Sequence, residues 1–327
     1  MLGCMGLENA RPRSIKRATE VEVAGALKLI FQRARQPTRS EQVVAALDEI
    51  ERSPKENRIL LAARRDGESV GAVWSQIRAG RVAALWPPGL ADSEQSSTAV
   101  ALVNAAIFNA AKSGVRLIHS LLAEDQLEES VWLTGCGFKK AADLQYLVCP
   151  RAKFPSDPPR GGLIFEPICE LSTIEMSQEK LARLAHIIER TYEKSLDCPV
   201  LRGVRSIEDV IAGYQGTGEF NPSQWFFVRH PQRESDIGCL LLAEHPREAR
   251  SEIVYMGVSP EERGSGWGLE IVRYAQWLAG TPIATSAADK ELVLAVDGAN
   301  RPAVRVYERA GFECHARRNV FLRVIDS

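Results

Sequence analysis

The chain presents the same order of predicted elements twice. In the second half, the spacing of apolar residues predicts two helices, three strands, a helix, a strand, a helix and a last strand near NVFLRVI. The first half predicts two helices, a hairpin that turns at RDGE, a third strand, a helix, a strand and a helix. The last helix of each half ends in Gly-Phe, at Gly137-Phe138 and at Gly311-Phe312. This repetition predicts a tandem duplication of one α/β unit.

A segment rich in proline and glycine separates the two halves. Residues 149–162 read CPRAKFPSDPPRGG, and four prolines and two glycines in this span disfavour a regular element. We therefore predict a first domain over residues 1–150, a linker over 151–162 and a second domain over 163–327. The length of 327 residues agrees with two domains, at roughly 150 residues each.

Composition narrows the class of protein. The 41 basic and 42 acidic residues nearly cancel, which argues against nucleic acid or an anionic membrane as a partner. The seven cysteines are scattered without a C-x-x-C pair, so we predict free thiols and no metal site. The first residues lack the apolar core of a signal peptide, and no apolar run approaches the roughly 20 residues of a membrane span. A cytoplasmic protein is expected, and an oligomer is neither indicated nor excluded.

A glycine-rich stretch precedes a predicted helix at residues 259–270, SPEERGSGWGLE. Arg263 is followed there by glycines at 264, 266 and 268. The first backbone N–H groups of a helix and the positive end of its dipole form a site for an anion such as pyrophosphate. The spacing departs from the dinucleotide fingerprint, because Leu269 stands where the third glycine belongs, and no Gly-Lys-Ser/Thr follows. The glycines alone fit a phosphate loop and a structural turn equally well.

Two motifs resemble a known superfamily. Residues 258–268, VSPEERGSGWG, resemble the acetyl-CoA signature of the GNAT superfamily of N-acyltransferases, V-x-x-x-x-[QR]-x-x-G-x-[GA]. Residues 297–312, DGANRPAVRVYERAGF, resemble its second motif at Asn300, Ala303, Tyr307 and the final Gly-Phe. The resemblance covers the second half well and the first half only by element order. It implies two GNAT-like domains in tandem, each with a mixed, mainly antiparallel central sheet flanked by helices.

The resemblance also implies a reaction, in which a primary amine attacks the thioester of acetyl-CoA directly. Tyr307 would protonate the departing CoA sulfur, although a tyrosine here could also be a core residue. Glu252 would be the base, with a solvated carboxylate at the strand end as the alternative. Asp197, Glu244 and His245 are further candidates, and a chain of waters could replace a dedicated base.

The residues expected to hold acetyl-CoA lie on the end of a strand, on the glycine loop and on the helix starts that follow. They are Met256, Gly257, Val258, Arg263, Gly264, Ser265, Gly266, Trp267, Gly268 and Asn300. Asn300 could equally be a helix N-cap. The glycine cluster at 213–220, read as a mobile loop, and residues 193–203 would shape the acceptor pocket.

The first half lacks these features. After its third strand the sequence GLADSEQSSTAV places Asp92 and Glu94 where the second half has its glycine loop. Gln126 and Leu133 take the places of the asparagine and the tyrosine of the second motif. We therefore predict a degenerate, non-catalytic first domain and an N-acetyltransferase in the second. The alternative is a non-catalytic regulatory protein that binds acyl-CoA. Small amine, aminosugar, amino acid and protein N-terminus all remain open as acceptors, as does the acyl chain length.

Overall fold

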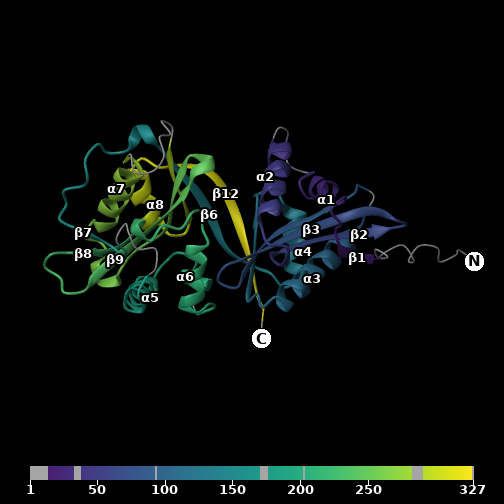
Figure 1. Ribbon diagram of the computed structural model, residues 1–327, viewed down its shortest axis with the longest axis horizontal. Coiled ribbons are helices and arrows are strands. Elements are labelled where there is room, and N and C mark those ends of the chain that lie inside the picture. Colours follow the sequence, from purple (N-terminus) through teal and green to yellow (C-terminus); the bar gives the residue numbers. More distant parts are fainter. Residues whose placement is uncertain are drawn as a thin grey trace, which may run out of the picture. The chain divides into compact units, whose positions relative to one another are not determined.

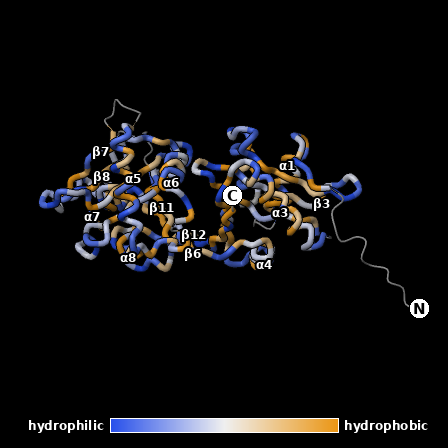
Figure 2. Tube along the Cα trace, turned by 90° about the horizontal axis from the view of Figure 1, so that it is seen from below, coloured by the Kyte–Doolittle hydropathy of each residue, from blue (hydrophilic) through white to orange (hydrophobic). Residues whose placement is uncertain are grey.

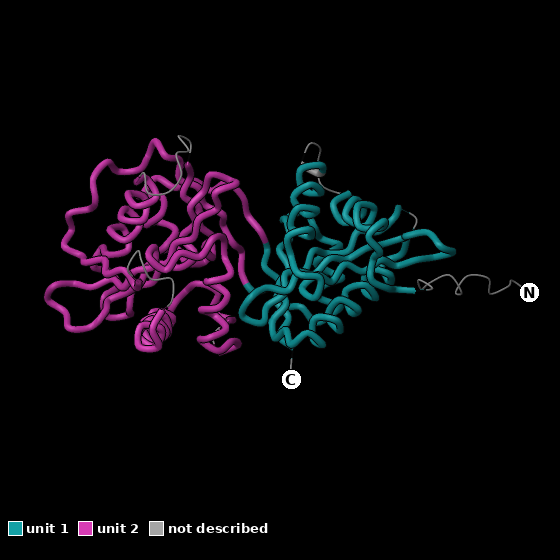
Figure 3. Tube along the Cα trace, in the orientation of Figure 1, with its two compact units in different colours: residues 1–141, 319–327 teal, residues 142–318 magenta. Residues whose placement is uncertain are grey.

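The computed structural model describes residues 14–32, 38–92, 94–169, 176–201, 203–281 and 290–325. The chain divides into two compact units (Figure 3): unit 1 comprises Met1–Ala141 and Asn319–Ser327, and unit 2 comprises Ala142–Arg318. Within the described ranges, no helix has the length and apolar character needed to cross a bilayer. The six cysteines of those ranges are all free thiols, and Cys4 lies outside them.

Unit 1 contains a six-stranded sheet with the order β1-β2-β3-β4-β5-β12. Its strands are antiparallel except for the parallel pair β4 and β5. Its elements (Figure 1) are β1 Ser14–Arg17, α1 Val23–Ile30, α2 Thr38–Arg52, β2 Arg58–Arg65, β3 Glu68–Arg78, β4 Val82–Leu90, α3 Ser96–Lys112, β5 Leu117–Leu122 and α4 Leu127–Gly135.

Unit 2 repeats this plan with the strand order β6-β11-β10-β9-β8-β7, in which only β10 and β11 run parallel. Its elements are β6 Lys139–Pro150, β7 Ile164–Pro167, α5 Gln178–Tyr192, α6 Ile207–Gln215, β8 Trp225–Arg229, β9 Asp236–His245, β10 Arg250–Val258, α7 Trp267–Ala279, β11 Glu291–Asp297 and α8 Arg301–Arg309. The strand β12, Glu313–Val324, begins in unit 2 and belongs to unit 1 from Asn319 onward. The described parts therefore confirm the predicted fold class, a mixed and mainly antiparallel sheet flanked by helices.

Helices cover both faces of the sheet in unit 2. Successive side chains of a strand point to opposite faces, and β9 follows this rule with an apolar run from Cys239 to Ala243. Leu240 and Leu242 pack in the core that includes residues of α7 and α8. Cys239 and Leu241 pack in the core that includes residues of α5 and α6. Figure 2 shows the result as hydrophobic stretches within each unit, with hydrophilic positions along the helices.

Each unit completes its sheet with a strand from the other half of the chain. β6 follows α4 of unit 1, yet its residues Leu144–Pro150 pair antiparallel with β11 of unit 2. β12 follows α8 of unit 2, yet its residues Asn319–Val324 pair antiparallel with β5 of unit 1. The two repeats have thus exchanged their last strands.

This exchange moves the division between the units away from the boundary expected at residues 151–162. That proline-rich segment connects β6 to β7 inside unit 2. Phe154 and Leu163 at its two ends pack against the unit 2 core, and the Leu163 N–H donates a hydrogen bond to Glu270 Oε1 at 3.0 Å. Within this stretch the structure has one short 3₁₀ helix, Arg151–Lys153, and the packing of the segment's ends ties it to unit 2.

Candidate active site

A wedge opens in the sheet of unit 2 between two parallel strands. β10 and β11 pair only where they begin, over Arg250–Glu252 and Glu291–Val293. On their outer edges both strands stay paired for longer, β10 with β9 to Val258 and β11 with β6 to Asp297. The two strands therefore separate beyond Glu252, and their facing edges carry backbone groups that do not pair across the wedge.

An irregularity in β10 accompanies the separation. The register with β9 shifts between Ile253 and Tyr255, so Val254 is an extra residue in this strand. Ile253 packs toward α7 and α8, whereas Tyr255 packs toward α5 and α6. A bulge of this kind bends a strand and increases its twist, which turns the end of β10 away from β11.

The end of β10 lies close to α5 because a glycine stands there. A side chain on Gly257 would bring its Cβ within 2.6 Å of Thr191 Cβ. The Thr191 and Tyr255 hydroxyl oxygens lie 2.6 Å apart, which fixes α5 against the strand from the other side. Gly257, which was expected to bind the cofactor, is thus also needed for the close packing of β10 against α5.

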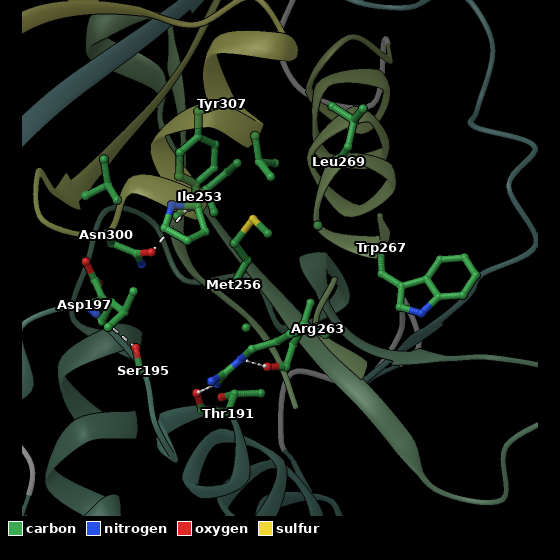
Figure 4. Close-up of a pocket in the computed structure, with 18 of the residues that line it drawn as sticks. Thr191, Ser195, Asp197, Ile253, Met256, Arg263, Trp267, Leu269, Asn300 and Tyr307 are labelled. Atoms are coloured by element: carbon green, nitrogen blue, oxygen red, sulfur yellow. Dashed lines mark hydrogen bonds between the residues drawn. The ribbon is translucent and has the colours of Figure 1, made fainter. Parts of the chain in front are cut away.

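A cavity of about 500 Å³ occupies the wedge. It is lined by the end of β10, the glycine loop, the starts of α7 and α8, the end of β11 and the segment after α5. Figure 4 shows Tyr307, Met256, Asp197 and Arg263 reaching it from four different elements. Of the residues expected from the sequence, the lining includes Met256, Gly257, Val258, Arg263, Gly264, Gly266, Trp267, Gly268, Asn300 and Tyr307, and it lacks Ser265 and Glu252.

The glycine loop leads directly into α7. Gly264 and Gly266 have φ of 86° and 87°, a left-handed conformation that other residues rarely adopt. Gly266 is the N-cap of α7, and no side chain caps this helix end. Gly268 differs, because an added Cβ would meet only Val306 at an ordinary distance of 3.7 Å. The start of α7 therefore presents uncapped backbone donors to the cavity, as an anion site requires.

Arg263 forms hydrogen bonds with backbone carbonyl groups of neighbouring segments, which its charge alone does not predict. Its guanidinium donates to the Val258 carbonyl at 3.1 Å, to the Lys194 carbonyl at 3.2 Å and to the Thr191 carbonyl at 2.8 Å (Figure 4 shows Thr191). These carbonyls belong to the end of β10 and to the end of α5 and the segment after it. Arg263 thus ties the glycine loop to α5, as a planar fork of several donors can.

Tyr307 lines the cavity from the buried face of α8. Its side chain is 7% exposed and meets Phe312 edge to face, with ring centroids 5.7 Å apart. Burial raises the pKa of Tyr307 well above its ordinary value, and the charge of Asp197 raises it further. No described residue forms a hydrogen bond with its hydroxyl. Tyr307 is therefore a protonated phenol at neutral pH that has its proton available.

Asn300 holds the start of α8. Its side-chain oxygen accepts a hydrogen bond from the Ala303 N–H at 3.3 Å, so it is an N-cap, and it lines the cavity as well. The structure thus confirms the N-cap reading of Asn300, and its binding of the cofactor stays a prediction.

Glu252 lies at the apex of the wedge, at the last pair between β10 and β11. Its Oε2 is 2.8 Å from Nε2 of His245, and this contact raises the pKa of His245. Glu244, another candidate base, is bound to Lys290 at 2.8 Å and accepts from Ser251 at 2.9 Å. These carboxylates therefore have partners within the protein.

The loop at 213–220 is held by local contacts. Residues 213–215 belong to α6, and the Glu219 N–H donates to the Glu244 carbonyl at 2.8 Å. A side chain on Gly218 would approach that carbonyl to 2.6 Å. The expectation of a mobile loop therefore gives way to a segment fixed on the end of β9.

Two carboxylates beside this cavity stand out more clearly in the structure than in the sequence. Asp197, a minor candidate, lines it, and Asp297, not considered, is 3% exposed at the end of β11. Asp197 Oδ1 accepts from the Asp297 N–H at 2.8 Å, and Asp297 Oδ2 accepts from the Cys198 N–H at 3.3 Å. The sequence signal was the Asp that ends the strand three residues before Asn300.

Comparison with known proteins agrees with this geometry. Residues 188–312 match the Acetyltransferase (GNAT) family, and this range lies within unit 2. Comparison with curated protein sequences gave no match. This segment of unit 2 therefore matches a GNAT acetyltransferase domain, a fold that supports acyl transfer in general.

Solved structures extend the likeness to the whole chain. A GCN5-related N-acetyltransferase from Sphaerobacter thermophilus is similar at 14% identity and a TM-score of 0.63, over 96% of each chain. A glucosamine N-acetyltransferase region of a fungal multi-domain β-N-acetylglucosaminidase gives 15% and 0.61, over 94% of this chain and 38% of that one. A tandem GNAT protein from the clavulanic acid biosynthesis pathway gives 14% and 0.51, over 96% of this chain and 99% of that one. At such identities the likeness shows the fold alone, and the described parts of the chain form two GNAT-like units in tandem.

Proposed function

We propose that unit 2 is an N-acetyltransferase that moves the acetyl group of acetyl-CoA to a primary amine by direct attack. The observation that carries this proposal is the uncapped start of α7 beside a wedge that also contains Tyr307. A single cavity would thus combine an anion site, a backbone edge and a proton donor. Acetyl-CoA needs all three, and when bound it would supply the thioester.

The residues of the cavity fit the parts of acetyl-CoA. Backbone N–H groups of Gly264 to Gly268 would hold the pyrophosphate at the positive end of α7. Backbone groups of Met256 to Val258 lie on the unpaired edge of β10, where they would bind the pantetheine amides and steady the developing oxyanion. Trp267 would flank the loop, and in Figure 4 its indole lies apart from Tyr307 and Met256.

Two proton transfers complete the proposed reaction. Tyr307 would give its proton to the CoA sulfur as the C–S bond breaks, because its raised pKa keeps the phenol protonated. A carboxylate would take a proton from the acceptor amine. Glu252 lies outside the cavity lining and would act through an intervening water, whereas Asp197 lines the cavity directly.

Calorimetric titration with acetyl-CoA tests the proposal. Wild type should bind one acetyl-CoA per chain. Gly268→Glu should weaken binding by on the order of 100-fold, because its carboxylate would stand at the proposed phosphate site. Gly268 suits this test because it has room for a Cβ, whereas a side chain on Gly266 would strain the backbone.

The matched control is Gly25→Glu in α1 of unit 1, where an added Cβ meets nothing within 4 Å. It introduces the same side chain and should leave binding unchanged. Thiol release is then followed with a panel of small amines, aminosugars, amino acids and peptides with free N-termini. Absence of acetyl-CoA binding by wild type contradicts the proposal. Binding without transfer to any of these amines would support the non-catalytic alternative instead.

A further inference from the structure

The turn between β8 and β9 is fixed beside the glycine loop by two contacts. This turn comprises residues 230–235. The ring centroid of His230 lies 5.1 Å from that of Trp267, the first residue of α7. Nε of Arg233 donates a hydrogen bond to Oε1 of Glu262 at 2.7 Å, and Glu262 ends the 3₁₀ turn that precedes the glycine loop. One contact is therefore made before the loop and the other after it.

Glu262 is a buried acid at a place proposed to bind an anion. It is 8% exposed and lines the cavity. A carboxylate beside a phosphate site opposes phosphate binding, and its burial costs free energy unless a cation or hydrogen bonds compensate. Arg233 supplies that compensation. The ion pair thus places a guanidinium directly against a side chain of the cavity wall, at the rim of the cavity.

Arg233 keeps most of its hydrogen-bond donors available. The bond from Nε to Glu262 is the one that its guanidinium forms with the residues that the structure describes. Its side chain is 56% exposed, so solvent reaches it. A guanidinium carries five N–H donors in a planar fork that matches the oxygens of a phosphate. The two Nη groups of Arg233 are therefore held in place without being used.

Other cations near the loop lack this combination. Arg263 is bound to three backbone carbonyls. Arg190 of α5 pairs with a carboxylate of the 3₁₀ turn. Lys194 and Arg309 line the cavity, but neither forms an ion pair with a residue that the structure describes. Arg233 thus combines a fixed position with available donors, and a fixed side chain loses less conformational entropy when a ligand binds.

We propose that Arg233 binds a phosphate group of acetyl-CoA, and that Glu262 is the positioning residue that holds it there. This inference rests on the proposed function and extends its anion site from the backbone of the glycine loop to a side chain of the β8–β9 turn. The Nη groups bind the phosphate while Nε stays on Glu262. Acetyl-CoA offers this chemistry at two places, its pyrophosphate and its ribose 3′-phosphate.

Calorimetric titration of the full chain with acetyl-CoA tests the inference. Arg233→Gln should bind acetyl-CoA at least about 10-fold more weakly than wild type, because a charge-assisted contact is lost. Arg250→Gln is the matched control. Nε of Arg250 also donates to a glutamate, Glu291 at 3.3 Å, and its side chain is 46% exposed, but it lies at the start of β10, away from the glycine loop. It should bind acetyl-CoA like wild type.

A double variant separates phosphate binding from simple neutralisation of Glu262. Arg233→Gln alone leaves a carboxylate without its cation beside the phosphate site, and this repulsion would weaken binding by itself. Arg233→Gln combined with Glu262→Gln removes the repulsion. If Arg233 contacts a phosphate, the double variant should still bind at least about 5-fold more weakly than wild type. A return to wild-type affinity would mean that Arg233 only neutralises Glu262, and would overturn the inference.

Acetyl-dephospho-CoA, which lacks the 3′-phosphate, identifies the phosphate that is bound. A loss in Arg233→Gln that is confined to acetyl-CoA assigns Arg233 to the 3′-phosphate, and an equal loss with both ligands assigns it to the pyrophosphate. Both results support the inference. The two proposals fail separately: tight binding by wild type that Arg233→Gln leaves unchanged removes only this inference, whereas absence of acetyl-CoA binding by wild type removes the proposed function.

Discussion

Helices α3 and α7 hold the same place in the two units, yet their N-termini differ. Neither N-cap residue, Gly266 of α7 or Gln95 of α3, caps its helix with a side-chain hydrogen bond. At α3 the carboxylate of Glu94 accepts from the Gln95 N–H at 2.9 Å and from the Thr98 hydroxyl at 3.0 Å, and it pairs with Arg65 at 3.0 Å. The Glu94 side chain is only 4% exposed. Unit 1 thus places its own anion where unit 2 leaves room for one.

The backbone frames around these helices are otherwise alike. β4 and β5 pair only over Val82–Ala84 and Leu117–His119, which repeats the short pairing of β10 and β11. Gly89 receives the end of α1 as Gly257 receives α5. At the tyrosine position of the second motif, unit 1 has Leu133, which is fully buried in its core. The separation of the two parallel strands is therefore a property of the fold in both units. A few side chains, such as the residue at the tyrosine position, distinguish the two sites.

The largest expected effect concerns which residues unit 2 needs. Residues 163–327 alone lack β6, so β11 loses the seven residue pairs that join Glu291–Asp297 to Leu144–Pro150. An unpaired strand edge beside the cavity exposes backbone groups and apolar surface. We expect no measurable acetyl-CoA binding by this fragment in calorimetry. Coexpression with residues 1–162 should restore binding, and full affinity of the fragment alone would show that unit 2 does not depend on β6.

The next effect probes the tyrosine that unit 1 lacks. Tyr307→Phe keeps the ring and its contact with Phe312 but removes the proton donor. We expect kcat for acetyl transfer to fall by about 100-fold or more, with acetyl-CoA affinity within about 2-fold of wild type. Stopped-flow thiol release and calorimetry measure the two quantities. An unchanged kcat would give Tyr307 the same packing role that Leu133 has.

Removing the internal anion of unit 1 should cost stability without creating a site. Glu94→Gln weakens the hydrogen bonds at α3 and removes the ion pair between Glu94 and Arg65, so we expect a loss of about 2 kcal/mol in the free energy of unfolding. Urea unfolding of the full chain measures it, with the exposed Glu68→Gln as control. Acetyl-CoA stoichiometry should stay at one per chain. A second site in this variant would mean that Glu94 alone separates the two units.

The smallest expected effect is a pH dependence of the free energy of unfolding that arises in unit 2. Contact with Glu252 raises the pKa of His245 in the folded state. The histidine then stabilises the fold while the pH is below its unfolded pKa, and this contribution disappears as the pH rises through the folded pKa. The pair is partly exposed, so the change should be at most about 1 kcal/mol. Urea unfolding between pH 5 and 9 should show it in wild type and lose it in Glu252→Gln; an equal pH dependence in both would contradict it.

Sequence patterns predicted those elements of unit 2 whose formation depends on residues close together in the chain. The strands β8 to β11, the helices α5 to α8 and the N-cap at Asn300 follow from periodicity and capping residues. The strand β6, KKAADLQYLVCP, was missed because its polar residues hide the alternation and its partner lies far along the chain. The short edge strands β1 and β7 gave too little pattern to detect.

The contacts of the site residues were harder to predict, because their partners also lie far along the chain. Sequence shows that Arg263 is a cation, but only the fold brings the carbonyls of Thr191 and Lys194 to it. Asp197 looked like one carboxylate among many on a loop. Its contact with Asp297 depends on how the segment after α5 meets the end of β11, and no local rule encodes that meeting.

The exchanged strands also set an order for biosynthesis. A ribosome completes β1 to β5 early, but the strand that borders β5, Asn319–Val324, emerges only after all of unit 2 has been made. Domains that fold as they are synthesised usually finish from the N-terminus onward. Here the β5 edge of the nascent first unit stays unpaired until β12 has been synthesised, whereas β6 has been synthesised before β11 emerges. Unit 2 can therefore close its sheet first, and the earlier-made unit is the last to be completed.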